Sequence, residues 1–304
     1  MTGMRLVMVI LTVAGGAFGV KARAQTPMPR DTISVGGRVR EYYVYRDLRS
    51  DSVRSAPLVL FFHGGGGSAT GAMGRYGLND VAGAAGAIVV YPEGINGHWA
   101  DGRGIFHDAD DVAFAKALVD RLRNRFRVDP RRIYAAGHSN GAILANTVAC
   151  RVPGLLAAIG AVSGTIPVND VRACLATTPL SVIEIHGTSD PLTPYAGGEV
   201  NRNHGFITSA EGSIGEWGRV DGCKSPPVRT ALPPRVSTDP TRVVTFEYLG
   251  CRAGRAVVLY AIQGAGHDWP GATGHLPEAA VGPTSRQIDA TRIIWDFFVA
   301  HPAP

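Results

Sequence analysis

The sequence predicts an α/β domain in which helices cover both faces of a doubly wound, mostly parallel sheet. Short runs that are almost entirely apolar recur along the chain, as expected for parallel strands buried on both faces. Segments with the apolar period of a helix lie between these runs. The chain has 304 residues, of which 45% are hydrophobic and 18% charged. This composition can build a sizeable core and excludes wholesale disorder.

The strands are expected at the apolar runs, in chain order. An early strand with alternating side chains is predicted over residues 39–45. Five further strands are predicted over 57–62, 87–91, 132–136, 180–185 and 256–262. Residues 222–253 contain five prolines and interrupt this rhythm, and we interpret them as an excursion from the sheet rather than as a second domain.

Two helices stand out between and after the strands. The first has one apolar face, formed by Ala115, Leu118, Val119, Leu122 and Phe126. Asp110 and Asp111 lie at its start, where carboxylates stabilise the positive end of the helix dipole, so capping is favoured over metal binding. The last helix places Ile288, Ile294, Trp295 and Phe298 on one stripe, which is expected to pack on the sheet.

The N-terminal segment has the pattern of a secretory signal peptide. A short basic stretch is followed by an apolar run of about 15 residues, which is too short for a typical membrane-spanning helix. An Ala-Arg-Ala sequence then predicts cleavage after Ala24. We therefore expect a signal peptide over 1–24, a loose segment over 25–34 and one domain over 35–304, exported to the periplasm or beyond without a stable membrane anchor.

The basic charge of the whole chain does not indicate nucleic-acid binding. The formal net charge is +5, but residues 1–24 carry three basic residues and no acidic residue. The remaining chain has 27 basic and 25 acidic residues, which removes most of the excess.

Four cysteines, all after residue 149, are expected to form two disulfides in an exported chain. Three pairings are possible. We favour Cys150–Cys174 and Cys223–Cys251 because each closes a short local loop. The sequence contains no Cys-x-x-Cys and no histidine pair at ligand spacing, so a metal site is not expected.

The sequence Gly137-His138-Ser139-Asn140-Gly141 follows a predicted strand and begins a helix-compatible run. This is the strand–turn–helix context of a G-x-S-x-G nucleophile turn, which would hold the Ser139 hydroxyl at the tip of the sheet. A serine needs a base to act as a nucleophile. Asp190 and His267 each follow a later predicted strand, in the chain order Ser, Asp, His. We therefore predict Ser139 as nucleophile, His267 as base and Asp190 as the acid that orients it.

A run of four glycines, residues 64–67, follows the strand predicted over 57–62. It has no following Lys-Ser or Lys-Thr, so it is not a phosphate-binding P-loop. Backbone N–H groups in such a loop can approach a developing oxyanion. We predict the N–H groups of Gly65 and Asn140 as the oxyanion hole, with Gly66 as an alternative to Gly65.

These motifs resemble the esterase family of polyhydroxybutyrate depolymerases and feruloyl esterases, within the α/β-hydrolase superfamily. The resemblance extends from about residue 35 to the end and includes the segments 63–68, 91–94, 99–103, 128–134 and 266–271. It implies a carboxylic ester hydrolase that needs no cofactor. Members act on polyesters, on feruloylated xylan or on small esters, so the acyl and alcohol groups stay open. No separate polymer-binding domain is expected, which favours small or oligomeric esters.

Two tryptophans, Trp99 and Trp269, are predicted to line the cleft, where an aromatic face suits a feruloyl ring or an acyl chain.

The sequence leaves two other functions open. Related hydrolases with the same serine motif are peptidases, and a hydrolase scaffold can serve as a non-catalytic binding module. The complete set of Ser, His and Asp argues against the second. The oligomeric state is left open.

Overall fold

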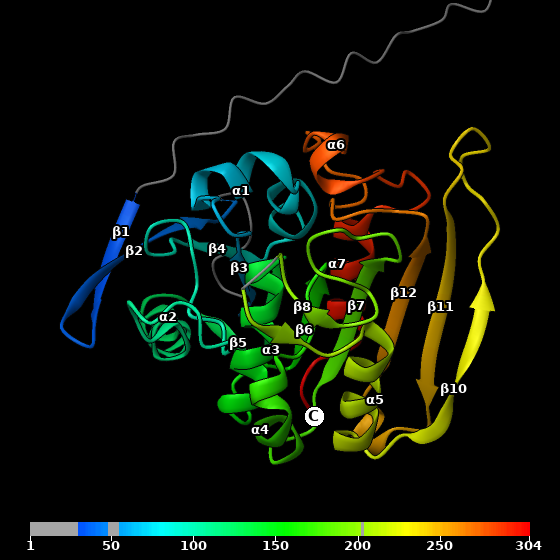
Figure 1. The fold of residues 1–304 in the computed structure, drawn as a ribbon. Coiled ribbons are helices and arrows are strands. Elements are labelled where there is room, and N and C mark those ends of the chain that lie inside the picture. The colour runs from blue at the N-terminus through cyan, green and yellow to red at the C-terminus, as the bar shows by residue number, and fades with distance from the viewer. Residues whose placement is uncertain (1–29, 48–54, 202–203) are drawn as a thin grey trace, which may run out of the picture.

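The computed structural model describes residues 30–47, 55–201 and 204–304, so the predicted signal peptide lies outside the described residues. In these ranges the chain forms one sheet in the order β1-β2-β4-β3-β5-β6-β7-β12-β11-β10, with helices on both faces (Figure 1). Neighbouring strands are parallel from β4 to β12 and antiparallel at both edges. The doubly wound, mostly parallel α/β fold predicted from the apolar runs is therefore confirmed.

The central parallel strands correspond closely to the predicted runs. They are β3 (Ala56–Phe62), β4 (Ile88–Pro92), β5 (Val128–His138), β6 (Ala158–Val162), β7 (Ser181–Gly187) and β12 (Val257–Gln263). Of these, only β6 was not predicted, because its sequence Ala-Ile-Gly-Ala-Val carries few large apolar side chains.

The N-terminal edge of the sheet differs from the expectation. Residues 30–34 were predicted to be loose, whereas Arg30–Val35 forms β1, which pairs with β2 (Arg38–Tyr45) as an antiparallel hairpin. The prediction was wrong because the segment is polar on its exposed face, and only alternate residues contact the core.

The proline-rich region at the other edge is also part of the sheet. Lys224–Ala231 (β10) and Arg242–Leu249 (β11) extend the sheet from β12, in place of the excursion predicted for 222–253. Prolines are tolerated here because β10 is an edge strand. The two ends of this hairpin are joined by the Cys223–Cys251 disulfide, and Cys150–Cys174 joins α3 to α4. Both predicted pairings are confirmed.

The helices pack on the two faces of the sheet. They are α1 (Ala69–Arg75), α2 (Asp111–Arg125), α3 (Asn140–Arg151), α4 (Val171–Leu175), α5 (Ala210–Val220), α6 (Glu278–Val281) and α7 (Ala290–Ala300). Asp110 caps α2 by accepting from the Ala113 N–H, as the capping interpretation predicts. Asp111 instead pairs with buried Arg40 at 2.6 Å. None of the helices in the described ranges is long and apolar enough to cross a bilayer.

Alternate residues of β3 point into two separate cores. Leu58, Leu60 and Phe62 pack with α2, α3 and α5 on one face. Val59 and Phe61 pack with α1 and α7 on the other. Buried on both faces, the central strands hold their carboxyl ends in fixed positions, and the loops that follow β3, β5, β7 and β12 meet at one edge of the sheet (Figure 1).

Candidate active site

A sharp turn at the end of β5 carries Ser139. Its φ of 56° and ψ of −122° lie in a region that residues other than glycine rarely adopt. The flanking glycines permit this turn, because a Cβ at Gly137 would collide with the backbone of Gly141 and Ala142, and one at Gly141 with the carbonyls of Phe62 and His63. The chain reverses into α3 at once. Ser139 is left at the surface of a cavity of about 760 Å³.

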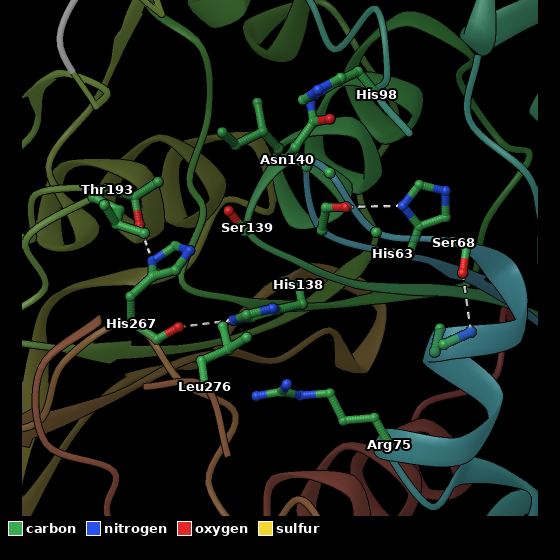
Figure 2. A pocket seen from close by; sticks show the side chains of 18 of the residues that line it. His63, Ser68, Arg75, His98, His138, Ser139, Asn140, Thr193, His267 and Leu276 are labelled. Carbon is green, nitrogen blue, oxygen red and sulfur yellow. Dashed lines mark hydrogen bonds between the residues drawn. The ribbon is translucent and has the colours of Figure 1, made fainter. Parts of the chain in front are cut away.

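His267 lies on the loop after β12, and its ring and Ser139 line the same cavity (Figure 2). The ring Nδ1 lies 2.7 Å from Asp190 Oδ2. Asp190 Oδ1 accepts from the N–H groups of Leu192 and Thr193, each at 2.8 Å. Burial favours the neutral acid, yet hydrogen bonds from His186 and His267 hold the pKa of Asp190 well below its usual range. The anionic carboxylate fixes the proton on His267 Nδ1 and leaves Nε2 as a proton acceptor.

The neighbouring acid, Asp268, points away from the His267 ring. Its oxygens accept from Arg75, from Thr284 at 2.8 Å and from the Trp269 N–H at 2.9 Å. His186, the other histidine close to Asp190, lies 2.8 Å from the Thr193 carbonyl. The structure thus brings together the three residues that the chain order predicted, Ser139, Asp190 and His267, and leaves their neighbours in structural contacts.

The glycine loop after β3 faces the first turn of α3. Asn140 begins that helix, so its N–H has no acceptor within the helix. A Cβ built on Gly65 would lie 3.6 Å from Asn140 Cβ and 3.3 Å from His98 Nδ1, so a side chain here would fill the space between them. The alternative donor, Gly66, already gives its N–H to the Gly97 carbonyl at 2.8 Å. This geometry favours Gly65 over Gly66.

Several buried bonds hold the glycine loop in place. The His63 ring accepts from the Gly94 N–H at 3.0 Å, and its other nitrogen lies 2.8 Å from the Gly64 carbonyl. The Asn140 side chain accepts from the Trp99 N–H at 2.9 Å and donates to Asp101 at 2.6 Å. The loop and the Ser139 turn are therefore each bonded to residues 94–101 before any ligand binds, as a preorganised oxyanion hole would require.

The prediction that Trp99 and Trp269 line the cleft was wrong. Both side chains are buried, at 0% and 1% exposed, and neither is among the described residues that line the cavity. The Trp99 indole donates to the His63 carbonyl at 2.8 Å, and the Trp269 indole donates to Thr291 at 3.0 Å. Since each N–H has a buried acceptor, the two rings are fixed in the core.

The aromatic wall of the cavity is formed by other residues. The His98 and Phe106 rings stack with centroids 4.5 Å apart, and His204 lies beyond Phe106 at 6.4 Å. Ile143, Leu192, Val200 and Leu276 add apolar lining. Apart from Ile143, which lies on α3, these residues lie on loops without periodic patterns, so no sequence pattern indicated them. Thr193, whose hydroxyl lies 2.9 Å from Asp190 and 3.0 Å from His267, was missed as well, although Asp-x-x-Thr is a turn pattern that could have indicated it.

Comparison with known proteins identifies the family of the chain. Residues 42–202 match the family model described as esterase PHB depolymerase. The chain belongs to this esterase family. It is therefore a carboxylic ester hydrolase. It is 31% identical over 284 residues to "Putative esterase NocK" of Nocardia uniformis subsp. tsuyamanensis, covering 88% of this chain and 81% of that protein.

Other members of the family and its fold are more distant. Feruloyl esterase B of Piromyces equi is 28% identical over 227 residues, which is 70% of this chain and 40% of that protein. The solved structure of an acetyl xylan esterase from Aspergillus awamori superposes with a TM-score of 0.59 at 16% identity, over 86% of this chain and 94% of that one. That likeness supports the α/β-hydrolase fold.

The contacts of Asp190 lead to a test of its role in this esterase. Asp190→Asn keeps the shape of the side chain but removes the negative charge that fixes the His267 tautomer. We expect kcat for p-nitrophenyl acetate to fall about 10,000-fold. Asp268→Asn is the matched control, because Asp268 adjoins His267 in sequence but pairs with Arg75. An equal loss in both variants, measured per folded molecule, would assign the effect to a general disturbance of the His267 loop and not to the charge of Asp190.

Proposed function

We propose that this esterase is exported and hydrolyses small or oligomeric esters through a Ser139–His267–Asp190 triad and a covalent acyl-enzyme. The observation that carries the proposal is the Ser139 turn beside a His267 ring whose Nδ1 is held by a buried Asp190. The two disulfides support an oxidising compartment. The 1–24 segment, with its signal-peptide pattern, supports export.

The reaction would proceed in two steps. In the first, His267 Nε2 takes the Ser139 proton as the serine oxygen attacks the ester carbonyl, and the alcohol leaves with a proton from His267. Asp190 stabilises the imidazolium that forms. In the second, His267 activates a water that releases the acid from Ser139. The N–H groups of Gly65 and Asn140 would bind the oxyanion in both steps.

The most direct test removes the nucleophile. We expect Ser139→Ala to lower kcat for p-nitrophenyl butyrate by at least a thousandfold, because no other hydroxyl occupies the turn. Ser189→Ala is a suitable control, since Ser189 is exposed on the Asp190 loop and should leave activity unchanged. Retention of more than a few per cent of activity by Ser139→Ala would refute the assignment. Turnover of aminoacyl-p-nitroanilides without ester turnover would instead favour a peptidase.

The stacked wall of the cavity favours a planar acyl group. Some relatives are named feruloyl esterases, and we propose that this chain also accepts a feruloyl group, placed against Phe106. Phe106 is half-buried, and its ring centroid lies 4.5 Å from that of His98 and 6.4 Å from that of His204. An aromatic ring placed against this wall would gain apolar burial and an aromatic contact.

Phe106→Ala tests the acyl preference separately from the triad. We expect kcat/KM for methyl ferulate to fall about tenfold, corresponding to the loss of one aromatic contact. The value for p-nitrophenyl acetate, whose acyl group is too small to reach the ring, should change less than about twofold. A similar loss for both esters would show that Phe106 supports the site rather than the acyl group. A wild-type preference for hydroxybutyrate oligomers over methyl ferulate would redirect the acyl assignment.

A further inference from the structure

The residue before the candidate nucleophile, His138, has both ring nitrogens in buried contacts. Its Nε2 lies 3.0 Å from the main-chain carbonyl oxygen of His267, and its Nδ1 lies 3.0 Å from the Tyr76 hydroxyl (Figure 2 shows the first contact). A carbonyl oxygen can only accept, so the proton resides on Nε2. Nδ1 is then an acceptor, and the Tyr76 hydroxyl donates to it. The two contacts together specify a single neutral tautomer.

Tyr76 is itself fixed. It is the C-cap of α1, and its carbonyl accepts from the Thr291 hydroxyl at 2.5 Å. Its ring packs against Trp269 and Phe61, with centroids 4.8 and 4.9 Å apart. Trp269 in turn lies two residues after His267 and contacts the His138 ring edge-on. The donor to His138 therefore cannot move away without disturbing the core between α1 and α7.

The charge state of His138 suits a place beside the catalytic base. Burial and the nearby His267 ring lower the pKa of His138 to about 3, and the charges of Asp268 and Arg75 act on it in opposite directions. The ring is therefore neutral at every pH at which an esterase of this kind is assayed. Its centroid lies 5.1 Å from that of His267. A neutral ring at this distance does not oppose the imidazolium that forms on His267 during turnover.

We propose that His138 is a positioning residue that ties the main chain of the His267 loop to the Ser139 turn, and thereby sets the approach of the base to the nucleophile. The inference rests on the proposed triad. The His267 loop has other anchors, since the N–H of His267 donates to the Val281 carbonyl at 2.6 Å and its ring contacts Asp190. Among the described residues, the His138 contact is the hydrogen bond that runs directly from this loop to the turn.

Two substitutions of His138 separate positioning from packing. His138→Leu fills the space but cannot donate to the His267 carbonyl, whereas the amide of His138→Gln can. With p-nitrophenyl acetate we expect His138→Leu to lower kcat about 100-fold with KM changed less than about twofold, since a shift of about 1 Å in a reacting group can have this effect. His138→Gln should recover kcat to within about tenfold of the wild type. The labelling rate of Ser139 by a fluorophosphonate should fall in parallel.

Tyr76→Phe provides a second route if His138→Leu does not fold. It keeps the ring packing but removes the hydroxyl that donates to Nδ1, so that the His138 ring loses one of the two hydrogen bonds that hold its orientation. We expect kcat to fall about tenfold with KM unchanged. Thermal melts of all variants give the folded fraction to which kcat is normalised.

The outcomes distinguish this inference from the proposed function. Full kcat in both His138→Leu and Tyr76→Phe, in a wild type that hydrolyses the ester, would overturn the positioning role alone. Equal kcat in His138→Gln and His138→Leu, per folded molecule, would do the same, because packing would then explain the loss. A wild type without ester hydrolysis would overturn the proposed function itself.

Discussion

The reversal of the chain at Ser139 is the constraint on which the rest of the site depends. The turn holds a serine at positive φ, and it closes because the glycines on either side let β5, α3 and the end of β3 approach at backbone contact. Strain of this kind persists only when the surroundings determine it. Here they do, since β5 lies between β3 and β6 in the middle of the sheet and α3 is buried along most of its length. The same close approach brings the glycine loop after β3 to the N-terminus of α3.

Three loops converge on this turn, and buried polar side chains hold each of them by hydrogen bonds. The glycine loop is held by His63 and by the Trp99 indole, the Asp190 loop by its Asp190–Thr193 turn, and the His267 loop by His138. Polar groups that are buried without partners are costly, so each of these bonds specifies one arrangement of its loop. The apolar layers fix where the strands end, and the polar bonds fix the side chains beyond those ends. Replacement of a proposed triad residue should therefore remove the chemical step. Replacement of one of these hydrogen-bonding side chains should instead alter the geometry in which that step takes place.

The sequence was sufficient for the features that depend on periodicity or on short local motifs. The parallel strands, the capped helix after Asp110, both disulfide pairings and the convergence of Ser139, Asp190 and His267 follow from apolar runs, from chain order and from cysteine spacing. The sequence was insufficient where the direction of a side chain decides whether the residue lines the cavity or packs in the core. Trp99 and Trp269 lie in motifs near the site, yet their indole N–H groups turn into the core, and the wall they were expected to form is built from His98, Phe106 and His204. Strand β1 was missed because its own composition does not indicate a strand, and the segment becomes one by pairing with β2.

We propose Ser139 as the nucleophile of a serine esterase, activated by His267. A fluorophosphonate probe forms a stable adduct with such a serine, and peptide mass spectrometry locates the adduct. We expect one phosphonyl group per molecule, on the peptide that contains Ser139, with ester hydrolysis lost in proportion to labelling. Labelling at another residue, or full hydrolysis by fully labelled protein, would contradict it.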